Sequence, residues 1–157
     1  MYVRESVDVA RQGMQDYLEE ISRMDIQQVS GVSHDPIRVK ALLNDMEALG
    51  LLFENLVLRD LRIYTQGVGA HLSQYRDSNG LEADIIIEAF GGKWAAIEVK
   101  LGVNRIDEGA ASLLRLAGEV DTSKMGKPSF LAVVTATGYA YKRQDGVFVL
   151  TIGSLKP

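Results

Sequence analysis

Cysteine is absent from this chain of 157 residues. The protein can therefore form no disulfide framework, no zinc site built on thiolates and no cysteine nucleophile. The chain also lacks an uninterrupted apolar run of roughly 18 residues, the length that suggests a membrane span. Its first twelve residues carry four charged side chains, which is not the pattern of a signal peptide. These absences predict a cytoplasmic protein with no membrane partner.

Several catalytic and nucleotide-binding motifs are missing as well. No G-x-x-x-x-G-K-[ST] loop occurs: the nearest stretch, "MGKPS", has Pro128 where Ser or Thr is needed and Asp121 in place of the first glycine. No ATP site is therefore predicted. His34 and His71 lie far apart with no matching carboxylate spacing, and no G-x-S-x-G nucleophile motif is present.

The composition is that of one ordinary globular domain. The chain is 46% hydrophobic and 24% charged, and its net charge of −4 argues mildly against a general nucleic-acid binder. The acidity is concentrated in the N-terminal third, so the rest of the chain can still present a local basic face. Five basic residues are candidates for a phosphate track, although charged residues most often lie on a solvated surface: Arg76, Lys93, Arg105, Lys142 and Arg143.

The N-terminal third has a helical pattern. Apolar residues recur at steps of three and four between Val3 and Met24, and a second such pattern runs through residues 42–61, with Gly50 as a point where it can kink or divide. Asp35 and Pro36 suit the N-cap and first position of a helix. We expect residues 1–44 to form a linker-like helical segment that packs on the domain or, failing that, serves as a homodimer surface.

The pattern changes to that of strands after residue 70. Three candidate strands cover residues 71–76, 82–90 and 93–101, joined by turn signals at residues 77–80 and 91–92. A helix over residues 107–120 with Asp107 as N-cap, a buried strand over 129–137 and a hairpin of 139–143 with 147–152 follow. The predicted core over residues 45–157 is an α/β sandwich around a mixed sheet, in the order helix, three strands, helix, strand.

The third strand, "KWAAIEVKLG", carries two charges in an apolar setting. Glu98 and Lys100 are two residues apart and share one face of a strand. Buried charges cost several kcal/mol per ion unless they are paired. Asp84, in "LEADIII", is a further charge that leads into the neighbouring strand. A surface ion pair, a closed Glu98–Lys100 ion network and a turn cap at Asp84 are the ordinary explanations.

The connection between these two strands decides which side chains share a face. A two-residue turn would set Asp84 and Glu98 on opposite sides of the sheet. A loop with an odd number of residues, or a bulge, would bring Asp84, Glu98 and Lys100 to one face, and we predict one of these. Two close carboxylates repel each other, and Mg²⁺ or Mn²⁺ suits the place between them. Lys100 would orient an attacking water and stabilise the developing charge, as in phosphodiester hydrolysis.

Asp84, followed fourteen residues later by Glu98-Val99-Lys100, resembles the PD-(D/E)XK motif of the restriction-endonuclease-like superfamily. The resemblance implies an α-β-β-β-α-β core, with Asp84 and Glu98 holding the metal and the Val99 carbonyl available to it. Lys100 would act on the water. In that superfamily a glutamate on the first core helix often completes the site, and Glu54 in "GLLFENLVLRDLR" fits that place. The alternative for Glu54 is a solvated helix residue.

A narrower resemblance covers about residues 45–157. The segments "GLLFENLVLRDLRIY", "YRDSNGLEADIIIE", "WAAIEVKLG", "AASLLRL" and "DGVFVLTIGSLKP" are similar in order and spacing to the C-terminal domain of unknown function of a prokaryotic AAA-type ATPase family. The ATPase module itself is absent. Three hypotheses result: a metal-dependent endonuclease acting on DNA, a non-catalytic module that binds DNA or a partner ATPase, and a truncated remnant of a longer ATPase.

Overall fold

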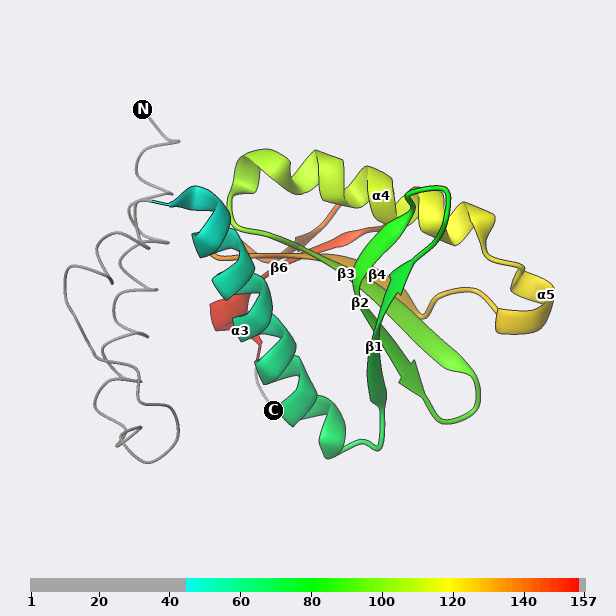
Figure 1. Cartoon of the computed structure of the whole chain (residues 1–157). Helices are drawn as coiled ribbons and strands as arrows, with labels where there is room; N and C mark the ends of the chain where they lie inside the picture. The colour runs from blue at the N-terminus through cyan, green and yellow to red at the C-terminus, as the bar shows by residue number, and fades with distance from the viewer. Residues whose placement is uncertain (1–44, 156–157) are drawn as a thin grey trace.

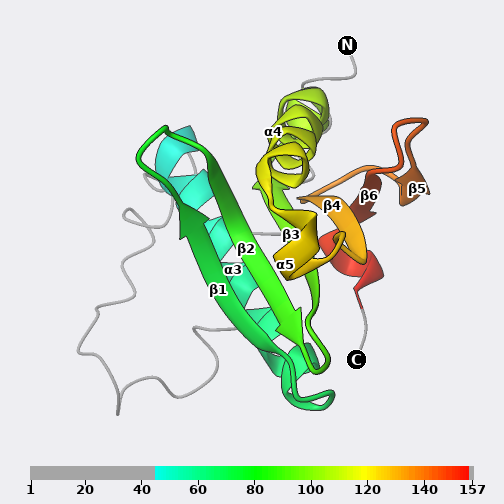
Figure 2. The same ribbon diagram turned by 90° about the vertical axis from the view of Figure 1, so that its right-hand side faces the viewer.

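A six-stranded mixed sheet lies between two long helices. The computed structural model describes residues 45–155, so the predicted stripe between Val3 and Met24 and the cap at Asp35–Pro36 lie outside the described residues. Helices α3 and α4 cover opposite faces of the sheet (Figures 1 and 2). The elements are α3 (Met46–Gln66), β1 (His71–Arg76), β2 (Glu82–Ala89), β3 (Lys93–Lys100), η2 (Val103–Arg105), α4 (Ile106–Glu119), α5 (Thr122–Met125), β4 (Phe130–Thr135), β5 (Tyr141–Lys142), β6 (Phe148–Thr151) and η3 (Ile152–Ser154).

The strand order is β1-β2-β3-β4-β6-β5, which confirms a mixed sheet. Strands β1, β2 and β3 form an antiparallel meander, β4 and β6 run parallel to β3, and β5 pairs antiparallel with β6 as the predicted closing hairpin. Parallel neighbours need a crossover connection, and α4 supplies the one between β3 and β4. Strands covered on both faces have near-continuous apolar sequences, which explains the composition of β3 and β4.

Helix α3 covers one face with a stripe of side chains at steps of four. Leu49, Phe53, Val57 and Leu61 are buried against the sheet. The helix begins at Met46, because the Asp45 carboxylate accepts hydrogen bonds from two first-turn N–H groups, both at 3.1 Å. The first residues of the sequence pattern, 42–44, lie outside the described residues. The helix also runs through Gly50 without being divided there.

Helix α4 covers the other face with Ile106, Ala110, Leu113 and Leu116. The prediction of Asp107 as its N-cap is wrong, because the helix begins at Ile106 and Asp107 lies inside the first turn. The 3-10 turn η2 runs directly into the helix, so the Ile106 N–H finds a backbone acceptor without a side-chain cap. No helix within residues 45–155 is long and apolar enough to cross a membrane.

The β2–β3 hairpin has the odd loop that the sequence analysis predicts. Ala89 pairs with Lys93, which leaves residues 90–92 as a three-residue loop. Gly91 and Gly92 adopt φ values of 80° and 73°, a conformation that glycine takes without steric cost. The paired register ends at Ile85 opposite Ile97.

A bulge interrupts β2 at the point where Asp84 lies. Along the β1–β2 pair, Ser73 faces Ile86 and Tyr75 faces Ala83, so two residues of β2 stand opposite one residue of β1. The extra residue breaks the alternation of side chains. Ala83 accordingly belongs to the core under α4, whereas Ile85 belongs to the core under α3. Asp84 therefore lies at the position where the side chains of β2 switch from the α4 face of the sheet to the α3 face.

Candidate active site

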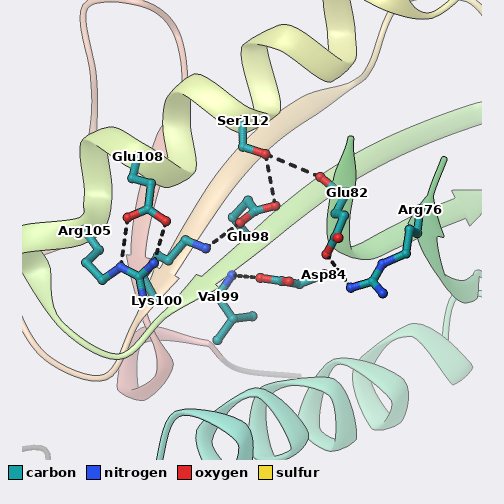
Figure 3. Close-up of polar contacts among 9 residues, drawn as sticks. All are labelled: Arg76, Glu82, Asp84, Glu98, Val99, Lys100, Arg105, Glu108 and Ser112. Carbon is teal, nitrogen blue, oxygen red and sulfur yellow. Dashed lines mark hydrogen bonds and ion pairs between the residues drawn. The ribbon is translucent and has the colours of Figure 1, made fainter. Parts of the chain in front are cut away.

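Glu98 and Lys100 form a buried ion pair beneath α4. Lys100 Nζ lies 2.7 Å from Glu98 Oε2, and the two side chains are 15% and 5% exposed (Figure 3). Burial raises the pKa of Glu98, Asp84 raises it further, and the hydrogen bond from Lys100 opposes the rise. The closed ion network that the sequence left open is therefore the arrangement found here.

Gly109 allows α4 to lie this close to the pair. A Cβ atom on Gly109 would lie 3.2 Å from Val133 Cγ2 and 3.4 Å from both Glu98 Cβ and Lys100 Cε. Any larger side chain would have to displace the strand residues or the helix. The small residue in the first turn of α4 thus positions the helix over the ion pair.

Asp84 binds the backbone of the neighbouring strand where the β2–β3 pairing ends. Its Oδ2 accepts a hydrogen bond of 2.7 Å from the Val99 N–H (Figure 3). Because strand N–H groups lie in the plane of the sheet, this carboxylate lies between the two faces and not on the face of Glu98 alone. The N–H and C=O of one strand residue point to the same neighbouring strand, so the Val99 carbonyl also faces this side.

Glu54 reaches the site from α3. Its side chain is partly buried, and it lines the same cavity as Asp84 and Lys100. Burial raises the pKa of Glu54, the negative charge of Asp84 raises it further, and Lys100 lowers it. The three groups therefore interact electrostatically across the cavity although they come from three elements.

The cavity has a volume of about 430 Å³ and lies between the N-terminal half of α3 and the segment that leads from β3 into α4. Its wall carries three acidic and two basic side chains, Glu47, Glu54, Asp84, Lys100 and Arg105. Glu98 does not line the cavity, so the prediction of one shared face is met only in part. Lys100 connects the cavity with the buried Glu98 side chain, because it lines the cavity and also pairs with Glu98.

The donor groups at the strand ends suit a hard divalent cation. Within residues 45–155, no three His, Asp or Glu side chains are gathered as a ready metal-binding cluster. Asp84 and Glu98 nevertheless offer two carboxylates, and Asp84 raises the pKa of both Glu98 and Glu54, as expected for carboxylates that repel each other. Mg²⁺ needs only one or two carboxylates and keeps several waters, so Asp84 and Glu98 are the carboxylates that could hold it at this place.

Two features of the site have little or no signal in the sequence. Ser112 Oγ lies 3.5 Å from Glu98 Oε1 and 3.4 Å from the Glu82 carbonyl oxygen, which ties α4 to both strands. A serine in the apolar helical stretch "AASLLRL" gives no hint of this. Arg105, one of five candidate basic residues in the sequence, lines the cavity and pairs with Glu108.

The other four candidates for a phosphate track lie elsewhere. Arg76 pairs with Glu82, and Arg143 pairs with acidic residues of α4 and of its own turn. Lys142 lies over the Phe148 ring, 5.1 Å from its centroid. Lys93 begins β3, at the opposite end of the strand from the site. None of the four lines the cavity, so the described residues present no continuous basic track from these positions.

Residues 49–155 match the family described as "Domain of unknown function (DUF4143)". The chain belongs to this family. The DUF4143 domain contains both hydrophobic cores and all of the predicted site residues, from Glu54 on α3 to Lys100 on β3. Searches among curated proteins and among solved structures find no match.

Proposed function

We propose that the DUF4143 domain of this chain has a restriction-endonuclease-like core and hydrolyses phosphodiester bonds of DNA with Mg²⁺ or Mn²⁺. The observation that carries the proposal is the convergence of Glu54, Asp84 and Lys100 on one cavity, with Glu98 paired to Lys100 directly beside it. These groups come from α3, β2 and β3, and they meet where the β2–β3 pairing ends. Ionisable groups gathered in a cleft, where burial and neighbouring charges shift their pKa values, are typical of an active site.

Each residue has a role that its position allows. Asp84 and Glu98, with the Val99 carbonyl, would hold the metal, and Glu54 would add a carboxylate from the far wall. The metal, when bound, supplies charge stabilisation at the phosphate and a more acidic water. The Lys100 ammonium orients the attacking water and donates hydrogen bonds to the charge that develops on the phosphate.

Lys100 also stabilises the protein when no metal is bound. A buried glutamate without a partner would cost several kcal/mol, and the 2.7 Å ion pair offsets this cost. In the proposed reaction the Lys100 ammonium would turn from Glu98 toward the cavity, which the Lys100 side chain already lines. The Glu98–Lys100 pair would thus stabilise the substrate-free protein, and its opening would make the Lys100 ammonium available for catalysis.

The second candidate is a non-catalytic module that binds DNA or a partner ATPase. The closed Glu98–Lys100 pair favours it, since the ion pair occupies a carboxylate that a metal needs. The lack of a gathered three-residue metal cluster in residues 45–155 points the same way. In this case the charges maintain the strand ends and have no role in chemistry.

The test is cleavage of supercoiled, linear, single-stranded and branched DNA with Mg²⁺ or Mn²⁺. We expect metal-dependent cutting that falls by at least about 100-fold in Asp84→Asn and Lys100→Ala, the size of effect typical for loss of one group that stabilises a transition state. Lys93→Ala is the matched control, because Lys93 is exposed at the opposite end of the same strand. Circular dichroism must show that each variant is folded, since removing Lys100 leaves Glu98 unpaired.

A second readout separates the two candidates. Metal binding to the folded state should raise the melting temperature of the wild type but not of Asp84→Asn. If no DNA is cut and no metal raises the melting temperature, the hydrolase proposal fails. The non-catalytic module would then account for the site.

A further inference from the structure

Arg105 is one of two basic residues of the described domain that line the cavity. It precedes α4 and lines the cavity together with Lys100. The Lys100 ammonium is already engaged by Glu98 at 2.7 Å in a pair shielded from water. Arg105 is therefore the cationic group of the cavity wall that a bound anion can reach without disturbing a buried ion pair.

Glu108 holds the Arg105 side chain in the geometry of a phosphate contact. Arg105 Nε donates to Glu108 Oε2 at 2.9 Å, and Nη2 donates to Oε1, so the guanidinium binds both carboxylate oxygens (Figure 3). The same two-pronged arrangement suits two oxygens of a phosphate group. Glu108 lies three residues along the chain, in the first turn of α4, and lies close enough to Lys100 for that charge to lower the pKa of its carboxyl group after the larger effect of Arg105.

Another anion can readily replace the Glu108 carboxylate as the partner of Arg105. Its two side chains are 57% and 56% exposed, in contrast with the shielded Glu98–Lys100 pair. Exposed ion pairs contribute little to stability, so water or a competing phosphate can displace the carboxylate at low cost. Phosphate contacts position nucleic acids on proteins, and arginine is a frequent donor in them.

We propose that Arg105 binds a backbone phosphate of a DNA duplex at the edge of the active-site cavity, and that Glu108 occupies the guanidinium until the DNA displaces it. This inference rests on the proposed function, because the phosphate would belong to the DNA that enters the site. It assigns Arg105 to substrate binding and Glu108 to competition with the substrate.

The experiment measures the affinity of the full chain for a short fluorescent DNA duplex over a range of salt concentrations, with Asp84→Asn as a common background that prevents cutting. Arg105→Ala should weaken binding about tenfold and make the plot of log affinity against log salt shallower by about one unit. Glu108→Gln should strengthen binding several-fold, because the competitor loses its charge. Arg76→Ala and Glu82→Gln are matched controls, since this exposed pair at 2.9 Å lies outside the cavity wall.

Equal affinities of Arg105→Ala and Arg76→Ala would overturn the inference, and so would an Asp84→Asn parent protein that binds no duplex. Weaker binding by Glu108→Gln would also contradict it, because Glu108 would then support binding. Failure of the proposed function can be told apart from failure of this inference. A protein that shows the expected binding pattern but cuts no DNA would keep Arg105 as a phosphate site and lose the hydrolase.

Discussion

Glu98 is an unusual residue to find in the middle of a sheet, at 4% exposed. Its charge is tolerated because Lys100 lies 2.7 Å away and because Ser112 offers a long hydrogen bond from α4. The Lys100 ion pair is the main compensation, since a buried charge without a partner costs several kcal/mol. At the scale of single residues, this network answers why a glutamate and a lysine interrupt an apolar strand.

Glu54 should make the stability of the protein depend on pH. Burial and the charge of Asp84 raise the pKa of Glu54 above the ordinary value of 4.5, so the folded state holds this proton more tightly than the unfolded state. Its contribution to stability is therefore lost as the pH rises through the window from 4.5 to the raised pKa. Glu54→Gln has no such proton, and we expect it to be more stable than the wild type at pH 8, with the difference shrinking as the pH falls through the window from the raised pKa to 4.5 and levelling off below it.

Urea unfolding over a series of pH values measures this difference. Glu119→Gln is the control, because it makes the same chemical change at an exposed position at the end of α4, outside the cavity wall. A Glu54→Gln variant whose advantage stays constant with pH, or grows as the pH falls, would show that Asp84 and burial do not act on Glu54 as proposed.

Helix α4 completes the site on the face of the sheet that carries Glu98 and Lys100. It supplies Ser112, lies over the Glu98–Lys100 pair and begins next to Arg105. The apolar side of the helix packs on β3 and β4, so its position is fixed by the core and not by the site. The polar groups that α4 contributes to the site are thus positioned by a helix whose own place is set by the burial of its apolar side chains.

Gly109→Val should therefore disturb both stability and the site. The added side chain would meet Val133, Glu98 and Lys100, and overpacking of this kind costs about 1–3 kcal/mol. Gly118→Val in the same helix is the matched control, because a Cβ there meets nothing within 4 Å. We expect the control to change the free energy of unfolding by less than about 0.5 kcal/mol. Denaturant unfolding of both variants checks this, and equal stabilities would contradict the close packing of α4 on β3.

The domain as a whole has one sheet and two cores. The core under α4 and the core under α3 share strands β2, β3 and β4, so neither forms without the other. Within the described residues 45–155, both cores are built from residues between Leu49 and Leu155. The division of the chain at residue 45 stays a prediction, and it requires that residues 45–157 hold a core sufficient to fold alone.

A fragment of residues 45–157 should fold and unfold as one cooperative unit. We expect it to melt within about 5 °C of the full chain, which corresponds to roughly 1 kcal/mol for a domain of this size. Calorimetry of the fragment beside the full chain makes the comparison. A fragment that unfolds without cooperativity would show that residues 1–44 contribute to the core, and the predicted boundary would be wrong.

The sequence by itself determined the two long helices, the six strands and their order along residues 45–155, but not the short elements η2, α5 and η3. Apolar steps of three and four predicted α3 and α4, alternation and turn residues predicted the strands, and the odd β2–β3 loop was a prediction that the register confirms. These features depend on neighbours within a few positions, which a sequence pattern contains. Asp84, Glu98 and Lys100 were found because charges next to apolar strands are conspicuous, and Glu54 was found because the resemblance to the PD-(D/E)XK motif implies a glutamate on the first core helix.

Only the tertiary structure decided how these charges meet. The bulge that turns Asp84 toward the Val99 N–H depends on pairing with β1, and the burial of Glu98 outside the cavity depends on how closely Gly109 lets α4 approach. The position of Arg105 on the cavity wall likewise follows from the packing of α3 against the end of β3. Contacts between distant segments are set by the packing of whole elements, and local periodicity carries no information about them.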